Sequence, residues 1–241
     1  MQTVPKVLAL WSAPRCRSTA FFRMMCERGD FHVLHEPFSY LAEFGEVEVD
    51  GRTKASEHEL IAAIRGLAER GPLFFKDTTD ERYPGVIADP GFLSHDGVHT
   101  FLIRSPVATI ASYQAINPDV GLHQIGFEAL YEIFSATWER TGTKPVVMDA
   151  DDLVADPVTM TRAYCARVDI DFVESSLTWR PESRPEWRPS RRWHVDVSES
   201  SGFRAARRDY RVDVATHPVF GAYLRHHLPF YEELYAHRLL A

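Results

Sequence analysis

Short apolar runs alternate along the chain with longer stretches in which apolar residues recur at helical spacing. Several runs are apolar throughout, which is typical of strands covered on both faces, as in a parallel sheet. Several helical stretches begin at Ser or Asp and end at Gly, as helix caps do. Strands are predicted at residues 7–11, 32–35, 73–76, 100–104 and 145–149. Helices are predicted at residues 18–29, 56–71, 105–116, 127–142 and 156–168, with a helical region after residue 216.

This alternation predicts the fold class. A strand–helix–strand order indicates an α/β protein with a central, mostly parallel sheet, flanking helices and right-handed crossovers. The clearest break in the pattern is the Pro-rich stretch 178–193, and we find no internal repeat. We therefore expect a single domain over residues 1–241.

Composition and cysteine usage narrow the class of protein. Of the 241 residues, 45% are apolar and 25% are charged, which excludes a disordered chain. No apolar run approaches the roughly 20 residues of a membrane span, and the N-terminus lacks the layout of a signal peptide. The three cysteines, Cys16, Cys26 and Cys165, stand at no metal-ligand spacing. We therefore expect a reduced, cytoplasmic protein without disulfides and without a bound metal.

Charge is unevenly spread along the chain. The net charge is −7, yet segment 180–211 holds nine arginines against five acidic residues. An acidic protein with one basic segment is not expected to bind nucleic acid, and the segment favours a local anion site. A solvated, arginine-rich loop is the alternative that charge alone leaves open.

The turn after the first predicted strand carries the first candidate anion site. Arg15, Arg17, Ser18 and Thr19 lie where a strand ends and a helix begins, so guanidinium groups and free helix N–H groups point at one place. Like a P-loop, the turn would bind an anion between the end of a strand and the start of a helix. It lacks the P-loop sequence, because it has no glycine and has Cys16 and Arg17 at the positions of the P-loop Gly and Lys. An ordinary capped helix with exposed arginines is the alternative.

A second candidate anion site follows the strand at 100–104. Arg104 ends this strand, Ser105 and Pro106 open a helix, and Ser112 comes eight residues after Arg104. Ser112 then lies two turns into the helix, so both side chains can reach one doubly charged phosphate beside it.

Together these stretches resemble the motifs of sulfotransferases that use 3′-phosphoadenosine-5′-phosphosulfate (PAPS). PRCRST (14–19) resembles their motif for the 5′-phosphosulfate, and some bacterial members are similar in reading P-R-S-x-S-T. Arg104, Pro106 and Ser112 match R-x-P-x-x-x-x-x-S, which binds the 3′-phosphate. VVMDADDLVADP (146–157) resembles a third family stretch. The sequence departs from the family at Arg17, which replaces a glycine common in the first motif.

The resemblance implies a fold, a reaction and a set of binding residues. The fold would be a three-layer sandwich similar to that of P-loop NTPases. The reaction would move a sulfuryl group from PAPS to a hydroxyl or amine of a small-molecule acceptor, leaving 3′,5′-bisphosphate (PAP) and needing no metal. The implied donor-binding residues are Arg15, Cys16, Arg17, Ser18, Thr19, Arg104 and Ser112.

The family's C-terminal loop closes over the nucleotide, which gives the Pro-rich region an expected role. We expect residues 178–202 to cover donor and acceptor, with residues 203–241 as a C-terminal helical region. Arg191, Arg192 and Gly202 are the candidate donor contacts there, and Trp193 is a candidate for ring stacking.

Two basic side chains are expected to act on the transferred group. Arg15 is predicted to contact the bridging oxygen and the sulfonyl group. Lys76, at the end of a strand, is either a further donor or a lysine in solvent. Many family members carry a histidine base two residues after such a lysine, but this chain has Thr78 at that position.

Glu36 is therefore the candidate general base. It precedes Pro37, which disfavours helix at Glu36 and is expected to hold it extended at a sheet edge. It also resembles a glutamate that relatives carry in an H-E-P or G-E-P context. His35 is the alternative base, and strand alternation predicts that only one of the two faces the site. Glu36 as an ion-pair partner of Arg15 or Arg17 is the structural alternative.

Other assignments stay open at this point. Asp77 and Asp80 are third choices for the base, and Asp77 is also a candidate helix cap. A P-loop small-molecule kinase or nucleotide-binding protein is the competing function, and a catalytically impaired PAPS-binding relative is another. The acceptor, whether carbohydrate, phenol, lipid hydroxyl or specialised metabolite, is not identified by the sequence, and neither is the oligomeric state, for which a homodimer is one option.

Overall fold

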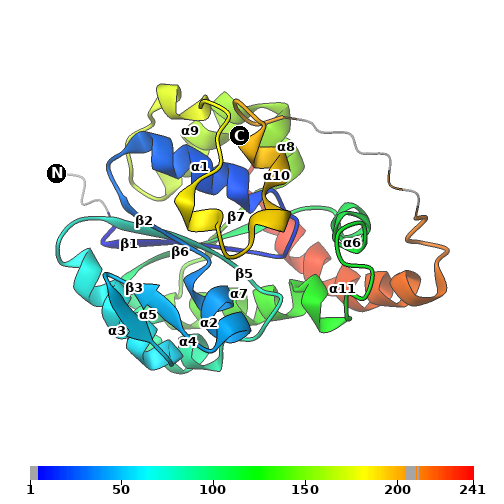
Figure 1. Cartoon of the computed structure of the whole chain (residues 1–241), viewed down its shortest axis with the longest axis horizontal. Coiled ribbons are helices and arrows are strands. Elements are labelled where there is room, and N and C mark those ends of the chain that lie inside the picture. The colour runs from blue at the N-terminus through cyan, green and yellow to red at the C-terminus, as the bar shows by residue number, and fades with distance from the viewer. Residues whose placement is uncertain (1–4, 205–209, 211) are drawn as a thin grey trace.

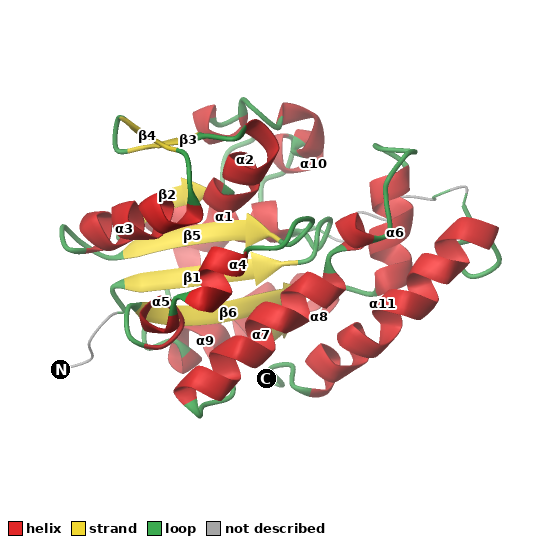
Figure 2. Ribbon diagram, turned by 90° about the horizontal axis from the view of Figure 1, so that it is seen from below, coloured by secondary structure: helices red, strands yellow, loops and turns green. Residues whose placement is uncertain are grey.

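The computed structural model of the chain describes residues 5–204, 210 and 212–241. Its centre is a five-stranded sheet in the order β2-β5-β1-β6-β7, and every pairing is parallel. The strands are β1 (Val7–Ser12), β2 (His32–His35), β5 (Leu73–Thr78), β6 (Gly97–Ile103) and β7 (Val146–Asp149). The predicted parallel sheet and its five strands are confirmed, and Figure 2 shows β5, β1 and β6 side by side.

The five helices predicted from periodicity are all present. They are α1 (Ser18–Arg28), α3 (Glu57–Ala68), α6 (Pro106–Gln114), α7 (Phe127–Thr141) and α9 (Pro157–Arg167). The expected C-terminal helical region contains α11 (Pro218–Ala236), whereas residues 205–209 and 211 of that region lie outside the described residues.

Several short elements were not predicted. They are α2 (Pro37–Phe44), α4 (Pro84–Ala88), α5 (Pro90–Ser94), α8 (Ala150–Ala155), α10 (Val195–Ser198) and the antiparallel hairpin β3 (Val47–Val49) with β4 (Arg52–Lys54). Three of the helices begin with proline at their first position, which is the signal that identifies them. The hairpin turns on Asp50-Gly51, both at positive φ, as a tight hairpin turn requires.

Helices cover both faces of the sheet and form three layers (Figure 1). The helices α1 and α9 lie on one face, and α3, α4, α5 and α7 lie on the other. The central strand β1 is buried along its whole length, with Trp11 fully enclosed between the layers. Its continuous apolar sequence therefore follows from burial on both faces. Among the described residues, none of the helices combines the length and apolar character needed to traverse a lipid bilayer.

The parallel arrangement gathers the loops that carry polar residues. The carboxyl ends of β1, β5 and β6 lie at one edge of the sheet, where ligands of open α/β sheets bind. The segment 178–202 consists of short helical turns and α10, and it crosses this edge, since the backbone of Trp193 contacts Arg15 in the turn after β1.

Candidate active site

A cavity of about 370 Å³ opens at the carboxyl edge of the sheet. Its walls come from the turns after β1, β2, β5 and β6 and from the crossing segment 178–202. It brings together most of the predicted site residues, namely Arg15, Arg17, Ser18, Thr19, Glu36, Lys76, Arg104, Ser112 and Gly202. Four predicted side chains do not line it: Cys16, His35, Arg191 and Arg192.

The turn after β1 has a strained backbone. Arg15 and Arg17 both have φ of 65°, and Arg17 is the N-cap of α1 without a side-chain cap hydrogen bond. The left-handed conformation costs an L-residue roughly 1–2 kcal/mol, and such strain gathers at functional sites. The alternative of an ordinary capped helix with exposed arginines is wrong, because neither arginine is fully exposed and no side chain caps the helix.

Arg15 joins the two predicted anion motifs. Its Nε donates to Ser112 Oγ at 3.2 Å, and its NH1 donates to the carbonyl oxygen of Trp193 at 3.0 Å. Residues 97 positions apart in the sequence therefore meet at one point, under the crossing segment. The two motifs form one site.

Arg17 and Arg104 converge on one carboxylate. Oδ1 of Asp151 lies 3.5 Å from Arg17 NH2 and 3.6 Å from Arg104 Nε. The pKa of Arg17 is lowered by burial and then by the charge of Arg104. Arg104 Nε is buried and has no hydrogen-bond partner among the described residues. Two guanidinium groups this close favour an anion between them, and Asp151, which sequence reasoning missed, is half exposed.

Glu36 and Lys76 form a buried ion pair in which the Lys76 ammonium donates to Glu36 Oε1. Lys76 is 1% exposed, so its interpretation as a lysine in solvent is wrong. The predicted ion pair of Glu36 with Arg15 or Arg17 is also wrong, because the partner is Lys76. Burial alone would raise the pKa of Glu36, but the charge of Lys76, with lesser contributions from His35 and His194, lowers it to about 2.

The backbone at Glu36 differs from the expectation. The residue is not extended: φ is 49° and ψ is 45°, left-handed, at the N-cap of α2. The following proline disfavours the right-handed helical region, and the sharp turn from β2 into α2 requires the left-handed one. The turn also brings the side chains of His35 and Glu36 together, with Nδ1 and Oε2 3.6 Å apart, although strand alternation predicts opposite faces.

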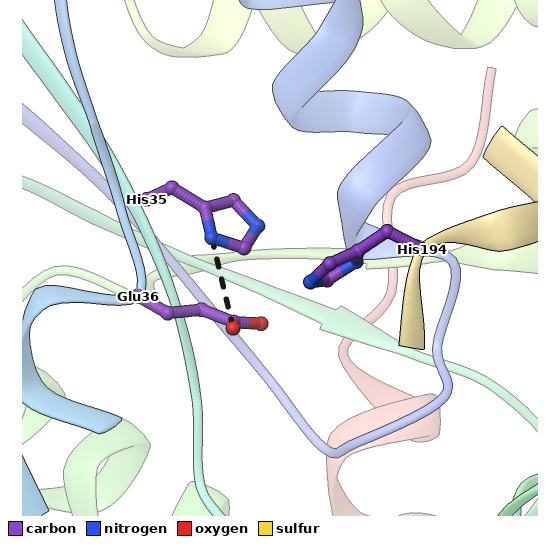
Figure 3. Close-up of side chains that lie close together, drawn as sticks. All are labelled: His35, Glu36 and His194. Carbon is purple, nitrogen blue, oxygen red and sulfur yellow. Dashed lines mark ion pairs between the residues drawn. The ribbon is translucent and has the colours of Figure 1, made fainter. Parts of the chain in front are cut away.

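His194 completes a buried group with these two residues (Figure 3). It lies on the crossing segment, and its ring nitrogens contact Thr19 Oγ1 at 3.1 Å and Ser190 Oγ at 2.9 Å. Burial lowers the pKa of His194 to about 4 and that of His35 well below its ordinary value. His194 thus ties the crossing segment to the first helical turn of α1.

The same three residues offer ligand atoms within 4.8 Å of one another, close enough to hold a metal ion. The ammonium of Lys76 already donates to Glu36 there, so a metal cation would meet a positive charge at its carboxylate ligand. Both nitrogens of His194 also have hydroxyl partners. This donor set fits a hydrogen-bonded network around an ion pair better than a metal centre.

Asp77 and Asp80, the third choices for the base, have different roles in the structure. Asp77 accepts hydrogen bonds from the backbone N–H groups of Phe38 at 2.7 Å and Ser39 at 3.0 Å, so it caps α2. Asp80 lines the cavity and accepts a hydrogen bond from Thr78 Oγ1 at 2.9 Å. Burial raises the pKa of Asp77 to about 7 and that of Asp80 to about 6.

The crossing segment contributes aromatic and basic groups. Trp193 lines the cavity and packs edge-on against Tyr113, with ring centroids 5.2 Å apart. The guanidinium of Arg192 lies over the ring of Trp193, 4.8 Å from the ring centroid. Gly202, Phe203 and Arg204 also line the cavity, and the carbonyl oxygen of Arg204 accepts from Arg17 NH1 at 2.8 Å. Three of the nine arginines of segment 180–211, namely Arg207, Arg208 and Arg211, lie outside the described residues.

Comparison with known proteins identifies a family. A model described as "Sulfotransferase domain" matches residues 6–238. A solved structure titled "Crystal Structure of Sulfotransferase from Alicyclobacillus acidocaldarius" aligns over 99% of this chain and 98% of its own, with a TM-score of 0.55 and 14% identity. At that identity the likeness supports the fold alone.

Two curated relatives from Arabidopsis thaliana are similar in sequence. "Branched-chain-amino-acid aminotransferase-like protein 1" is 31% identical over 97% of this chain and 42% of its own length. "Branched-chain-amino-acid aminotransferase-like protein 2" is 30% identical over 82% of this chain and 36% of its own length. The chain therefore spans less than half of either relative.

Proposed function

Because the chain belongs to the sulfotransferase family, we propose that it transfers a sulfuryl group from PAPS to a small-molecule acceptor. One observation carries the choice of donor: Arg15, Arg17 and Arg104 line one cavity, and Arg104 Nε is buried there without a hydrogen-bond partner among the described residues. A donor with phosphate groups at its 5′ and 3′ positions matches two separate strand–turn–helix anion sites.

The donor is held by the turns after β1 and β6. Arg17, Ser18 and Thr19 bind the 5′-phosphate together with the N–H groups at the start of α1, and Arg104 and Ser112 bind the 3′-phosphate. Cys16 contributes its backbone only, because its side chain is fully buried and burial raises the pKa of its thiol to about 12.

We assign Gly202, at the end of the crossing segment, and Arg204, two residues after it, to the donor, since both line the cavity. Arg192 instead supports Trp193 through the contact between its guanidinium and the ring. We assign no donor contact to Arg191, which is exposed and does not line the cavity.

Catalysis then rests on positioning and charge. Arg15 stabilises the charge that develops on the bridging oxygen, as a preorganised cation does in acyl and phosphoryl transfer. Lys76 turns part of its hydrogen bonding from Glu36 to the sulfonyl oxygens. As Lys76 withdraws, the carboxylate of Glu36 becomes a stronger base and takes the proton of the acceptor.

Nucleotide binding tests the proposal. PAP at 100 times its Kd is expected to stabilise the protein by about 2.7 kcal/mol without magnesium, a Tm increase of roughly 5–10 °C for a chain of this size. Thermal-shift titrations with PAP and with ATP, each with and without magnesium, measure this. Stabilisation by ATP only with magnesium would identify a P-loop kinase instead. PAP binding without turnover of labelled PAPS on any acceptor would identify the impaired relative.

Two substitutions of Arg17 separate the effect of backbone strain from the effect of the guanidinium charge. Arg17→Ala and Arg17→Gly both remove the guanidinium, so each should weaken PAP binding about 10- to 150-fold, the usual value of a hydrogen bond to a charged group. Only glycine adopts φ of 65° without cost, so the free energy of unfolding of the Gly variant should be about 1 kcal/mol higher than that of the Ala variant. Calorimetry with PAP and urea unfolding measure the two effects. Wild-type PAP affinity in the Gly variant would refute the assigned contact.

A further inference from the structure

The order of the strands divides the cavity into two halves. Apart from lining residues that come from the crossing segment and its continuation, one group with the donor residues follows β1 and β6, and a second group follows β5 and β2, which lie on the opposite side of β1. From those turns come Glu36, Ser39, Tyr40, Glu43, Lys76, Thr78 and Asp80. This second half is the space in which an acceptor would meet the transferred group, and it is called the acceptor half below.

The acceptor half carries excess negative charge. Lys76 is the one cation among its lining residues, and it is already paired with Glu36. Asp80 and Glu43 have no ion pair with any residue in the part of the chain that the structure describes. Glu43 is exposed, while Asp80 is partly buried and accepts hydrogen bonds from Thr78 Oγ1 and from its own backbone N–H. Burial of a carboxylate without a cation is costly, so Asp80 favours a positively charged ligand.

An aromatic wall lies near Asp80. Tyr113, on α6, lines the same cavity; burial and then the charge of Asp80 raise its pKa, and the charges of Arg15 and Arg192 act in the opposite direction. Trp193 packs edge-on against Tyr113 and holds the ring in place. A carboxylate beside an aromatic ring is an arrangement that binds ammonium groups, through charge and through the quadrupole of the ring.

We propose that the acceptor is a hydroxy compound that also carries a protonated amine, and that Asp80 binds this amine next to Tyr113. The inference rests on the proposed function, which supplies the donor. In the reaction the hydroxyl oxygen of the acceptor forms a bond to sulfur, and the bond from sulfur to the bridging oxygen breaks. PAP leaves with that electron pair, and the hydroxyl proton passes to Glu36. The ammonium group takes no part in the bond changes and orients the hydroxyl.

Acceptor pairs that differ only in this charge test the proposal. Tyramine with N-acetyltyramine and glucosamine with N-acetylglucosamine are titrated into the PAP-saturated protein, and their kcat/KM values with PAPS are compared. For at least one pair the amine should bind and react about 10- to 100-fold better than its acetylated partner, as expected for a charge-assisted contact. Asp80→Asn should abolish that preference. Glu81→Gln, the same change at an exposed neighbour outside the cavity, should retain it.

The possible failures point to different causes. A protein that does not bind PAP at all contradicts the proposed function, and the acceptor inference falls with it. PAP binding combined with equal or absent binding of both members of every pair overturns the acceptor inference alone. If Asp80→Asn slows amine and acetylated acceptors equally, Asp80 serves the reaction and not the amine, which also overturns it.

Discussion

Glu36→Gln is expected to lower turnover about 10²- to 10⁴-fold, which is the usual contribution of a positioned general base. The amide cannot take the proton of the acceptor, although it can still accept a hydrogen bond from Lys76. PAP affinity should stay near the wild-type value, because Glu36 lies on the side of β1 away from the donor residues. Single-turnover kinetics with labelled PAPS, alongside calorimetry with PAP, measure the two quantities.

The ion pair makes a stability control necessary. Removing one partner of a buried pair costs about 3–5 kcal/mol, because the other charge is left uncompensated. Unfolding free energies of Glu36→Gln and of Glu81→Gln, an equal change at an exposed site, separate this cost from the loss of turnover. A variant that fails to fold or to bind PAP would indicate a structural role for the pair.

A pH profile distinguishes the candidate bases. Burial would raise the pKa of Glu36, but the charge of Lys76, with lesser contributions from His35 and His194, outweighs burial and holds it at about 2, so Glu36 stays ionised throughout the range from pH 5 to 8. The pKa of Asp80 is raised by burial to about 6, so a base at Asp80 would produce a step in that range. Full activity of Glu36→Gln together with such a step would transfer the role of base to Asp80 or to Asp77, whose pKa burial raises to about 7.

Arg104→Ala is expected to weaken PAP binding by about 2–5 kcal/mol, the range found when one partner of a buried charge pair is removed. Adenosine 5′-phosphosulfate lacks the 3′-phosphate, so the variant should bind it with far less loss. Calorimetry with both nucleotides measures the difference. Equal losses would show that Arg104 does not bind the 3′-phosphate.

Arg238 provides a matched control for this variant. Its Nε is also buried without a hydrogen-bond partner among the described residues, and it lies 3.4 Å from Asp152, the neighbour of Asp151 on α8. It does not line the cavity. Arg238→Ala should therefore share any effect on α8 and on stability while leaving the affinity for both nucleotides unchanged.

The parallel sheet could be predicted from the sequence, and so could the residues that meet in the cavity after β1 and β6. Continuous apolar strands and capped helices can be recognised locally, because burial of one or both faces of an element sets the pattern of apolar residues within that element. Arg15, Arg17, Arg104 and Ser112 were predicted for the same reason. Each pair belongs to one strand–turn–helix unit, whose geometry depends on a few adjacent residues. Short helices such as α4 and α5 were missed because five residues carry too little periodicity.

The contacts made after β2 and β5 depend on the tertiary structure. Glu36 meets Lys76 because β2 pairs with β5 in a register that sets His35 beside Lys76, and the order of strands in a sheet is not encoded in either strand. Asp151 on α8 and His194 on the crossing segment contact Arg17 and Thr19, and each lies more than 100 residues from its partner in the sequence. Contacts of this kind join residues that are distant in the sequence and form only when the whole chain folds, so no local pattern predicts them.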